Sequence, residues 1–194
     1  MKIAVVGWGS LVWDPIDLET EGGFAPNGPL LPIEFCRVSR GGWLRLVIDE
    51  NYGAVCTTHS APSALDDLEA AIANMSLREN LREASAVGFV DLVSGHRSEA
   101  AMRRHPEALA TIASWAEANG YDAAVWSALP SNFSEPDKGG EPFSVSAAMA
   151  YLEALQQRDA NLFASALAYF RNAPREVETP VREEVAKRWP VGAA

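Results

Sequence analysis

A glycine-rich turn near the N-terminus is the first segment whose residue types could do chemistry. Gly7-Trp8-Gly9-Ser10 follows a short apolar run. The two glycines let the backbone approach a ligand closely, and successive N–H groups in such a turn can form a concave site for a carboxylate. Ser10 adds a hydroxyl, and Trp8 and Trp13 could wall a pocket. The structural alternative is a strand exit that lies beside two core tryptophans.

The same glycines do not make a dinucleotide-binding motif. That motif needs a third glycine three positions after the second, where the helix packs closely against the strand. Val12 occupies that position, and Pro15 follows in what looks like a loop. The pattern therefore argues against an NAD-dependent oxidoreductase.

Glu79 is the second candidate for chemistry. It follows Arg78 at the end of a segment with helical periodicity, just before a strand pattern. A carboxylate at such a junction can face a pocket while partly buried, which suits it to general acid or base catalysis. The simpler alternative is a solvent-exposed glutamate at a helix end.

The cysteines and histidines give weaker patterns. Cys56 and His59 lie three residues apart, so in an extended strand their side chains point to opposite faces, which is poor for a catalytic pair. A metal site would need further ligands, and neither His96 nor His105 has matching spacing. We expect Cys36 and Cys56 to be buried free thiols.

Composition limits the class of protein. The chain has 194 residues, with 16 Lys and Arg against 26 Asp and Glu, for a formal charge of −10. This balance argues against nucleic-acid binding, and the apolar runs are too short for a membrane span or a signal peptide. We therefore expect one cytoplasmic domain. The basic residues around His96-Arg97 and Arg103-Arg104-His105 are expected to form a solvated face.

Hydrophobic periodicity indicates the elements that must position these residues. Helical spacing predicts a helix over 62–77, with Ser60 or Ser63 as its N-cap, and another over 103–119 that ends at Gly120. Residues 14–32 and 130–142 are expected to be loops. Strands are predicted over residues 2–6, 34–39, 43–48, 52–58, 84–93 and 121–128, of which 34–39, 43–48 and 52–58 form a meander. Three helices are expected from Ser144 onward. The first spans about 144–158, the second continues to Phe170, and the third begins at Thr179-Pro180.

A family resemblance enters through the glycine turn. The segment Val6–Pro15 (VGWGSLVWDP) resembles the N-terminal G-Y-G-S-L-x-W-x-P signature of γ-glutamylcyclotransferase-like proteins, especially their ChaC-type, glutathione-degrading branch. Phe35–Arg40, followed by a strand, is similar to a second block of that branch. A helix that ends in Arg78-Glu79 matches where these families place their catalytic glutamate. The resemblance spans about residues 3–93.

The resemblance implies an intramolecular reaction. The α-amine of a small γ-glutamyl substrate attacks its own γ-carbonyl, which gives 5-oxoproline and a free amine. Glu79 would move the proton, and Trp8, Gly9, Ser10 and Leu11 would form the substrate-binding turn. Neither a metal nor an enzyme nucleophile is required, so no cofactor is expected.

The chain departs from the family pattern in three places. Trp8 stands where the family usually has Tyr, and the 14–32 loop is longer than its counterpart. Segment 125–133 and the helices after Ser144 lie outside the compact family pattern, which points to a divergent bacterial offshoot.

We expect an α+β fold in which a twisted mixed sheet, tending toward a small barrel, is surrounded by helices. Residues 1–194 would form a single domain, with a core over about 1–130 and a helical extension over about 144–194. The alternative function is a non-catalytic module that holds a small carboxylate ligand or a partner protein. The leaving amine, the oligomeric state and the role of residues 130–194 stay open.

Overall fold

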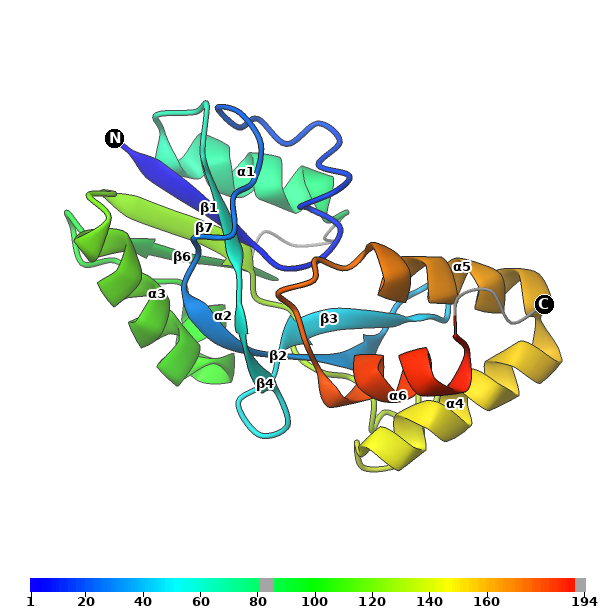
Figure 1. The fold of residues 1–194 in the computed structure, drawn as a ribbon. Helices are drawn as coiled ribbons and strands as arrows, with labels where there is room; N and C mark the ends of the chain where they lie inside the picture. The colour runs from blue at the N-terminus through cyan, green and yellow to red at the C-terminus, as the bar shows by residue number, and fades with distance from the viewer. Residues whose placement is uncertain (81–85, 191–194) are drawn as a thin grey trace.

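The computed structural model describes residues 1–80 and 86–190, which fold as an α+β structure with mixed and antiparallel sheets (Figure 1). The strands are β1 (Ile3–Gly7), β2 (Leu30–Val38), β3 (Leu44–Ile48), β4 (Ala54–Thr57), β5 (His59–Pro62), β6 (Val87–Asp91) and β7 (Ala123–Ser127). The helices are α1 (Leu68–Arg78), α2 (Glu99–Arg104), α3 (Pro106–Ala118), α4 (Val145–Arg158), α5 (Ala160–Asn172) and α6 (Pro180–Arg188).

The first sheet places β1 at its centre. Its order is β5-β1-β7-β6, and β1 runs parallel to β7 and antiparallel to β5. All five residues of β1 are buried because helices cover both faces of the sheet. Ile3 and Val5 pack with α1, whereas Ala4 and Val6 belong to the cluster that includes α3 (Figure 1). The glycine turn therefore leaves the end of a strand that is fixed on both faces.

The second sheet has the order β3-β2-β4, so β2 is central and the predicted meander is wrong. The predicted strand over 52–58 ends at Thr57, and only Thr58 separates it from β5, which pairs with β1 in the other sheet. In the described residues the strands form two open sheets, and the expected tendency toward a barrel is not seen. One continuous run of chain instead passes from one sheet to the other.

The end of one predicted loop differs from the sequence expectation for a local reason. The predicted loop over 14–32 ends earlier, because Leu30, Leu31 and Pro32 pair with β4. Pro32 is tolerated because pairing with β3 begins only at Ile33.

The first helix begins later than expected because β5 uses the residues before it. It starts at Leu68 instead of residue 62, and Asp67 caps it by accepting a hydrogen bond from the Ala70 amide at 2.9 Å. Neither Ser60, which is paired in β5, nor Ser63 is its N-cap.

The helix predicted over 103–119 is two helices, α2 and α3. Pro106 disfavours the helical conformation in the residue before it, and His105 accordingly has φ −144° and ψ 59°. The strand predicted over 84–93 appears as β6 over Val87–Asp91, while residues 84 and 85 of that prediction lie outside the described residues.

Helices α4, α5 and α6 cover the three-stranded sheet at one end of the molecule (Figure 1). Phe170 of α5 stacks on Phe35 of β2 with ring centroids 4.0 Å apart. The buried Glu34 carboxylate accepts hydrogen bonds from the amides of Phe35 at 2.7 Å and Val181 at 3.4 Å. Because Val181 lies in the first turn of α6, Glu34 anchors this helix to the sheet.

Glu34 predicts a pH dependence of stability. Burial raises the pKa of its carboxyl, although hydrogen bonds from Thr179, Phe35 and Val181 oppose this. The folded state therefore binds this proton more tightly than the unfolded chain. Its contribution to the free energy of unfolding is present at low pH and is lost as pH rises through the raised pKa.

Glu34→Gln should remove this contribution while keeping an acceptor for the helix. Urea unfolding from about pH 4 to about pH 8 should show the variant gaining stability relative to wild type as pH rises. The exposed Glu117→Gln on α3 is the control and should follow wild type. Parallel curves for Glu34→Gln and wild type would contradict the prediction.

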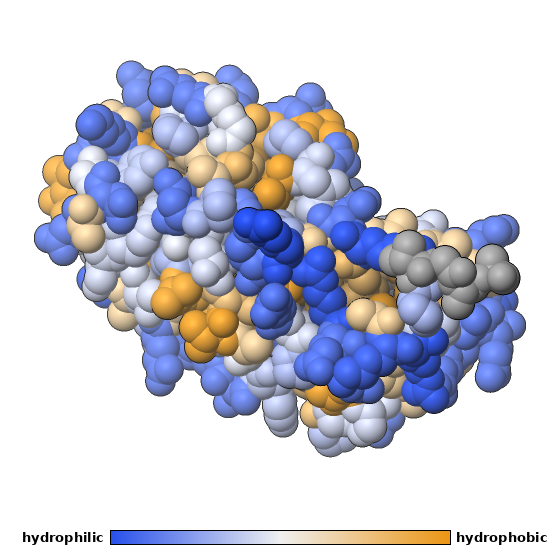
Figure 2. Space-filling model, viewed as in Figure 1, coloured by the Kyte–Doolittle hydropathy of each residue, from blue (hydrophilic) through white to orange (hydrophobic). Residues whose placement is uncertain are grey.

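The surface carries small, separated apolar patches on the face shown in Figure 2, and the surface over α6 is mostly hydrophilic. Leu30 and Val55, from β2 and β4, are among the exposed apolar side chains. Among residues 1–80 and 86–190, no helix has the length and apolar character needed to cross a membrane.

Candidate functional site

In the described part of the chain, the glycine turn leaves the amides of Gly9 and Leu11 without a hydrogen-bond partner. The Val12 amide donates to the Gly9 carbonyl and the Asp14 amide to the Ser10 carbonyl, each at 2.9 Å, which closes a compact turn. Within residues 1–80 and 86–190, the amides of Gly9, Ser10 and Leu11 donate to no backbone carbonyl. The turn therefore has the donors that a carboxylate needs.

Glu79 is positioned by the end of α1. The helix closes with the Glu79 amide on the Met75 carbonyl at 3.0 Å, and Asn80 then adopts φ 49°, a left-handed conformation that asparagine tolerates. The side chains of Arg78 and Glu79 are each only 9% exposed, with Nη1 and Oε1 3.6 Å apart. Glu79 is therefore not directed into bulk solvent.

Arg78 ties this helix end to the glycine turn. Its guanidinium donates to the carbonyls of Asp14 and Pro15, the latter at 2.8 Å, while it also pairs with Glu79. One arginine thus contacts both the exit of the turn and the carboxylate. This arrangement fixes the two sequence candidates relative to each other.

A small cavity of about 30 Å³ brings all five sequence-predicted site residues together. Its lining is Trp8, Gly9, Ser10, Leu11 and Glu79, with Arg37, Arg45, Leu46, Val47, Ser127, Leu129 and Tyr169. Because so small a space touches both the turn and Glu79, one small molecule can reach both. The cavity adjoins a cleft of about 580 Å³ with which it shares Arg37, Arg45, Glu79 and Leu129.

Trp8 forms a wall of the cavity. The side chain is buried, and its indole N–H donates to the Leu46 carbonyl at 3.4 Å. The indole donor is thus directed at β3. Trp8 therefore gives the turn a rigid apolar support.

Tyr169 of α5 is a residue of the cavity that sequence reasoning missed. Its ring packs edge-on against Trp13, with centroids 5.3 Å apart, and its hydroxyl lies 3.0 Å from where a Cβ on Gly9 would stand. Burial raises the pKa of this phenol; Glu79 adds to the effect, while Arg45 and the amides of Leu46 and Ser10 oppose it. The hydroxyl therefore stays protonated at neutral pH and can donate.

The arginines of the cleft were also missed. Arg37 and Arg45 lie in strand patterns that carry no local sign of a binding role. Arg104 and His105 were expected on a solvated face, and that expectation is wrong. Arg104 lines the cleft, and His105 is buried, which lowers its pKa to about 4. The break between α2 and α3 turns both residues inward.

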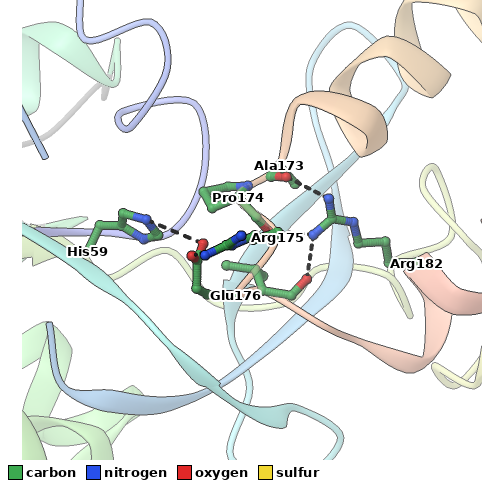
Figure 3. A network of polar contacts seen from close by, with 7 residues as sticks. His59, Ala173, Pro174, Arg175, Glu176 and Arg182 are labelled. Carbon is green, nitrogen blue, oxygen red and sulfur yellow. Dashed lines mark hydrogen bonds and ion pairs between the residues drawn. The ribbon is translucent and has the colours of Figure 1, made fainter. Parts of the chain in front are cut away.

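Cys56 and His59 contact the segment that leads to α6. The Cys56 thiol donates to the Glu178 carbonyl at 3.3 Å, and His59 Nε2 lies 3.6 Å from Glu176 Oε2 (Figure 3). Burial raises the pKa of Cys56 to about 11, so its thiol is protonated at neutral pH. These contacts fix the C-terminal segment against β4 and β5.

Cys36 is buried and free, and its thiol lies 3.4 Å from Asp49 Oδ2. In the part of the chain that the structure describes, no group of three or more His, Cys, Asp or Glu side chains could hold a metal ion.

The comparisons with known proteins add no relative to this geometry. No family model, no curated protein and no solved structure matches the chain.

Proposed function

We propose that this protein is a γ-glutamylcyclotransferase-like enzyme that releases 5-oxoproline and an amine from a small γ-glutamyl compound. The observation that carries the proposal is the shared cavity: the glycine turn, with the amides of Gly9 and Leu11, and the shielded Glu79 carboxylate line the same space. The sequence resemblance is consistent with these roles.

The reaction needs an anchor and a proton carrier. The amides of Gly9 and Leu11, with the Ser10 hydroxyl, would bind the α-carboxylate of the substrate. Glu79 would take a proton from the α-ammonium group, and the free amine would then attack the γ-carbonyl carbon. The bond from that carbon to the leaving nitrogen breaks as Glu79 returns the proton to it. The second proton that the ring nitrogen must lose passes through the same carboxylate to the released amine, which departs as an ammonium ion, so atoms and charges balance without water.

The dimensions of the cavity support a compact, folded substrate. A space of about 30 Å³ holds a water molecule or two, so only the reacting end of a ligand fits between the turn and Glu79. The departing part would extend into the adjoining cleft of about 580 Å³. Such confinement favours the ring-closing geometry that the attack requires.

A substrate panel tests this function. The protein is incubated with glutathione, γ-glutamyl dipeptides and γ-glutamyl amines, and 5-oxoproline is quantified. Release by wild type that disappears in Glu79→Gln supports the enzyme. Equal release by the variant contradicts the role of Glu79, and silence across the panel favours the non-catalytic binding module.

Gly9→Ala should damage catalysis more than stability. The new Cβ would stand 3.0 Å from the Tyr169 hydroxyl, so the phenol or the turn must shift by a few tenths of an ångström. We expect kcat/KM to fall about tenfold, because catalysis is sensitive to small displacements. Steady-state kinetics and thermal melting measure the two effects.

Two further variants make that result specific. Gly23→Ala is the matched control, since a Cβ there meets nothing within 4 Å. Tyr169→Phe removes the clashing oxygen, so Gly9→Ala should have little further effect in that background. Independent, multiplying losses in the double variant would contradict a clash between these residues.

A further inference from the structure

Three arginines converge beside the Glu79 cavity from three different elements. Arg37 lies on β2, Arg45 on β3 and Arg104 at the end of α2. Arg37 and Arg45 stand directly opposite each other in the antiparallel pair. Like charges in that position destabilise a sheet, so the pair has a cost that an anion placed between the two side chains would offset.

The donors of these arginines are largely uncommitted. Arg37 donates through Nη1 to the Pro130 carbonyl at 2.6 Å, and Arg104 through Nη1 to the Ala128 carbonyl at 3.0 Å. Among residues 1–80 and 86–190, the side chain of Arg45 has neither a hydrogen bond nor an ion pair. A guanidinium has about five N–H donors, so within this part of the chain most donors of the cluster are left for a ligand.

Two other arginines of the chain have structural roles, and their guanidinium groups make several contacts each. Arg182 donates to the carbonyls of Ala173, Pro174 and Val177, and Arg78 contacts two carbonyls and Glu79. Each of these guanidinium groups holds loops in place with several contacts. Within residues 1–80 and 86–190, by contrast, the side chains of Arg37 and Arg104 each make one such contact and that of Arg45 makes none.

The cleft around the cluster is locally positive in an acidic protein. Of the residues that the structure describes, six cationic and two acidic side chains line it, although the whole chain has a formal charge of −10. The cations are Arg37, Arg40, Arg45, Arg78, Arg104 and Lys138, and the carboxylates are Glu79 and Glu135. Burial lowers the pKa of Arg37, with Glu135 opposing and the charges of Arg45 and Arg104 adding to the effect.

We propose that Arg37, Arg45 and Arg104 bind an oxyanion with two negative charges, of the phosphate monoester class, on the departing part of the substrate. The placement on the substrate rests on the proposed function; the anion site itself does not. Three guanidinium groups exceed what one carboxylate can neutralise, and their planar forks match phosphate oxygens. Arg37 and Arg45 line both the cavity and the cleft, which places the anion on the side where the amine leaves.

Binding of inorganic phosphate tests the site without any turnover. Calorimetric titration with phosphate, against chloride at equal ionic strength, should show saturable binding to wild type. Arg45→Gln and Arg104→Gln should each weaken it about tenfold or more, the loss expected for a charge-assisted donor. Arg103→Gln, the exposed neighbour of Arg104, should bind as wild type does. Circular dichroism establishes that each variant is folded.

Three results of this titration would overturn the anion site. They are an absence of phosphate binding beyond that of chloride, wild-type affinity in both cleft variants, or an equal loss in Arg103→Gln. The last would reveal a general effect of net charge.

A pair of substrates tests where the anion belongs. Wild type should turn over γ-glutamyl-O-phosphoethanolamine with a kcat/KM about tenfold above that for γ-glutamylethanolamine, and Arg45→Gln should reduce this ratio toward one. Phosphate binding without such a preference would contradict placement on the departing part. If neither compound releases 5-oxoproline, the result contradicts the proposed reaction. The phosphate titration would still decide whether the anion site exists.

Discussion

Glu79→Gln should lower kcat for 5-oxoproline release by at least about a hundredfold, the usual contribution of a positioned acid or base. Glutamine has nearly the same shape and can still accept from Arg78, but it cannot carry a proton from the α-ammonium to the leaving nitrogen. Binding of the product 5-oxoproline, measured by calorimetry, should change little, because the turn amides remain. The loss should therefore fall on kcat and hardly on affinity.

Glu69→Gln is the matched control for this variant. Glu69 lies on the same helix but is exposed at its other end, away from the cavity. It should keep wild-type kinetics. Full activity in Glu79→Gln, or an equal loss in Glu69→Gln, would remove Glu79 from the mechanism.

Arg182→Met should lower the free energy of unfolding by about 3 kcal/mol, the cost of leaving several partly buried acceptors of a charged donor unpaired. The guanidinium donates to the Ala173 carbonyl at 2.6 Å and the Val177 carbonyl at 2.8 Å, and also to that of Pro174 (Figure 3). This side chain holds the segment between α5 and α6 in place. Methionine keeps much of the apolar stem but supplies no donor.

Arg175→Met separates this network from a general loss of charge. Arg175 lies in the same segment, but its side chain is 93% exposed and, among the described residues, pairs with the neighbouring Glu176 alone (Figure 3). Urea unfolding should give a change within about 0.5 kcal/mol of wild type for this control. Similar losses in the two variants would contradict the structural role of Arg182.

Elements with strong local signals were predictable from the sequence. The apolar run before Gly7 is β1, and the periodicity after Leu68 is α1, which ends beside Glu79. The residues beside these elements that could do chemistry, a glycine turn and a carboxylate at a helix end, are visible in the local sequence. The local sequence marks both features as candidates, whereas their combination in one site follows from the family resemblance.

Features set by distant partners were not predictable. The switch between sheets at Thr58 depends on the pairing of β5 with β1, which no local pattern between residues 52 and 62 reveals. Tyr169 reaches the cavity only because α5 packs against β2 through Phe170 and Phe35. The inward position of Arg104 likewise follows from the break at Pro106, which one long predicted helix concealed.

A structure of the protein with bound 5-oxoproline tests the central claim most directly. The account predicts that the product's carboxylate lies about 3 Å from the amides of the Gly9–Leu11 turn, with its ring nitrogen facing the Glu79 carboxylate. A product whose carboxylate is instead bound by Arg45, with Glu79 out of reach of the ring, would contradict a cyclotransferase site built from the glycine turn and Glu79.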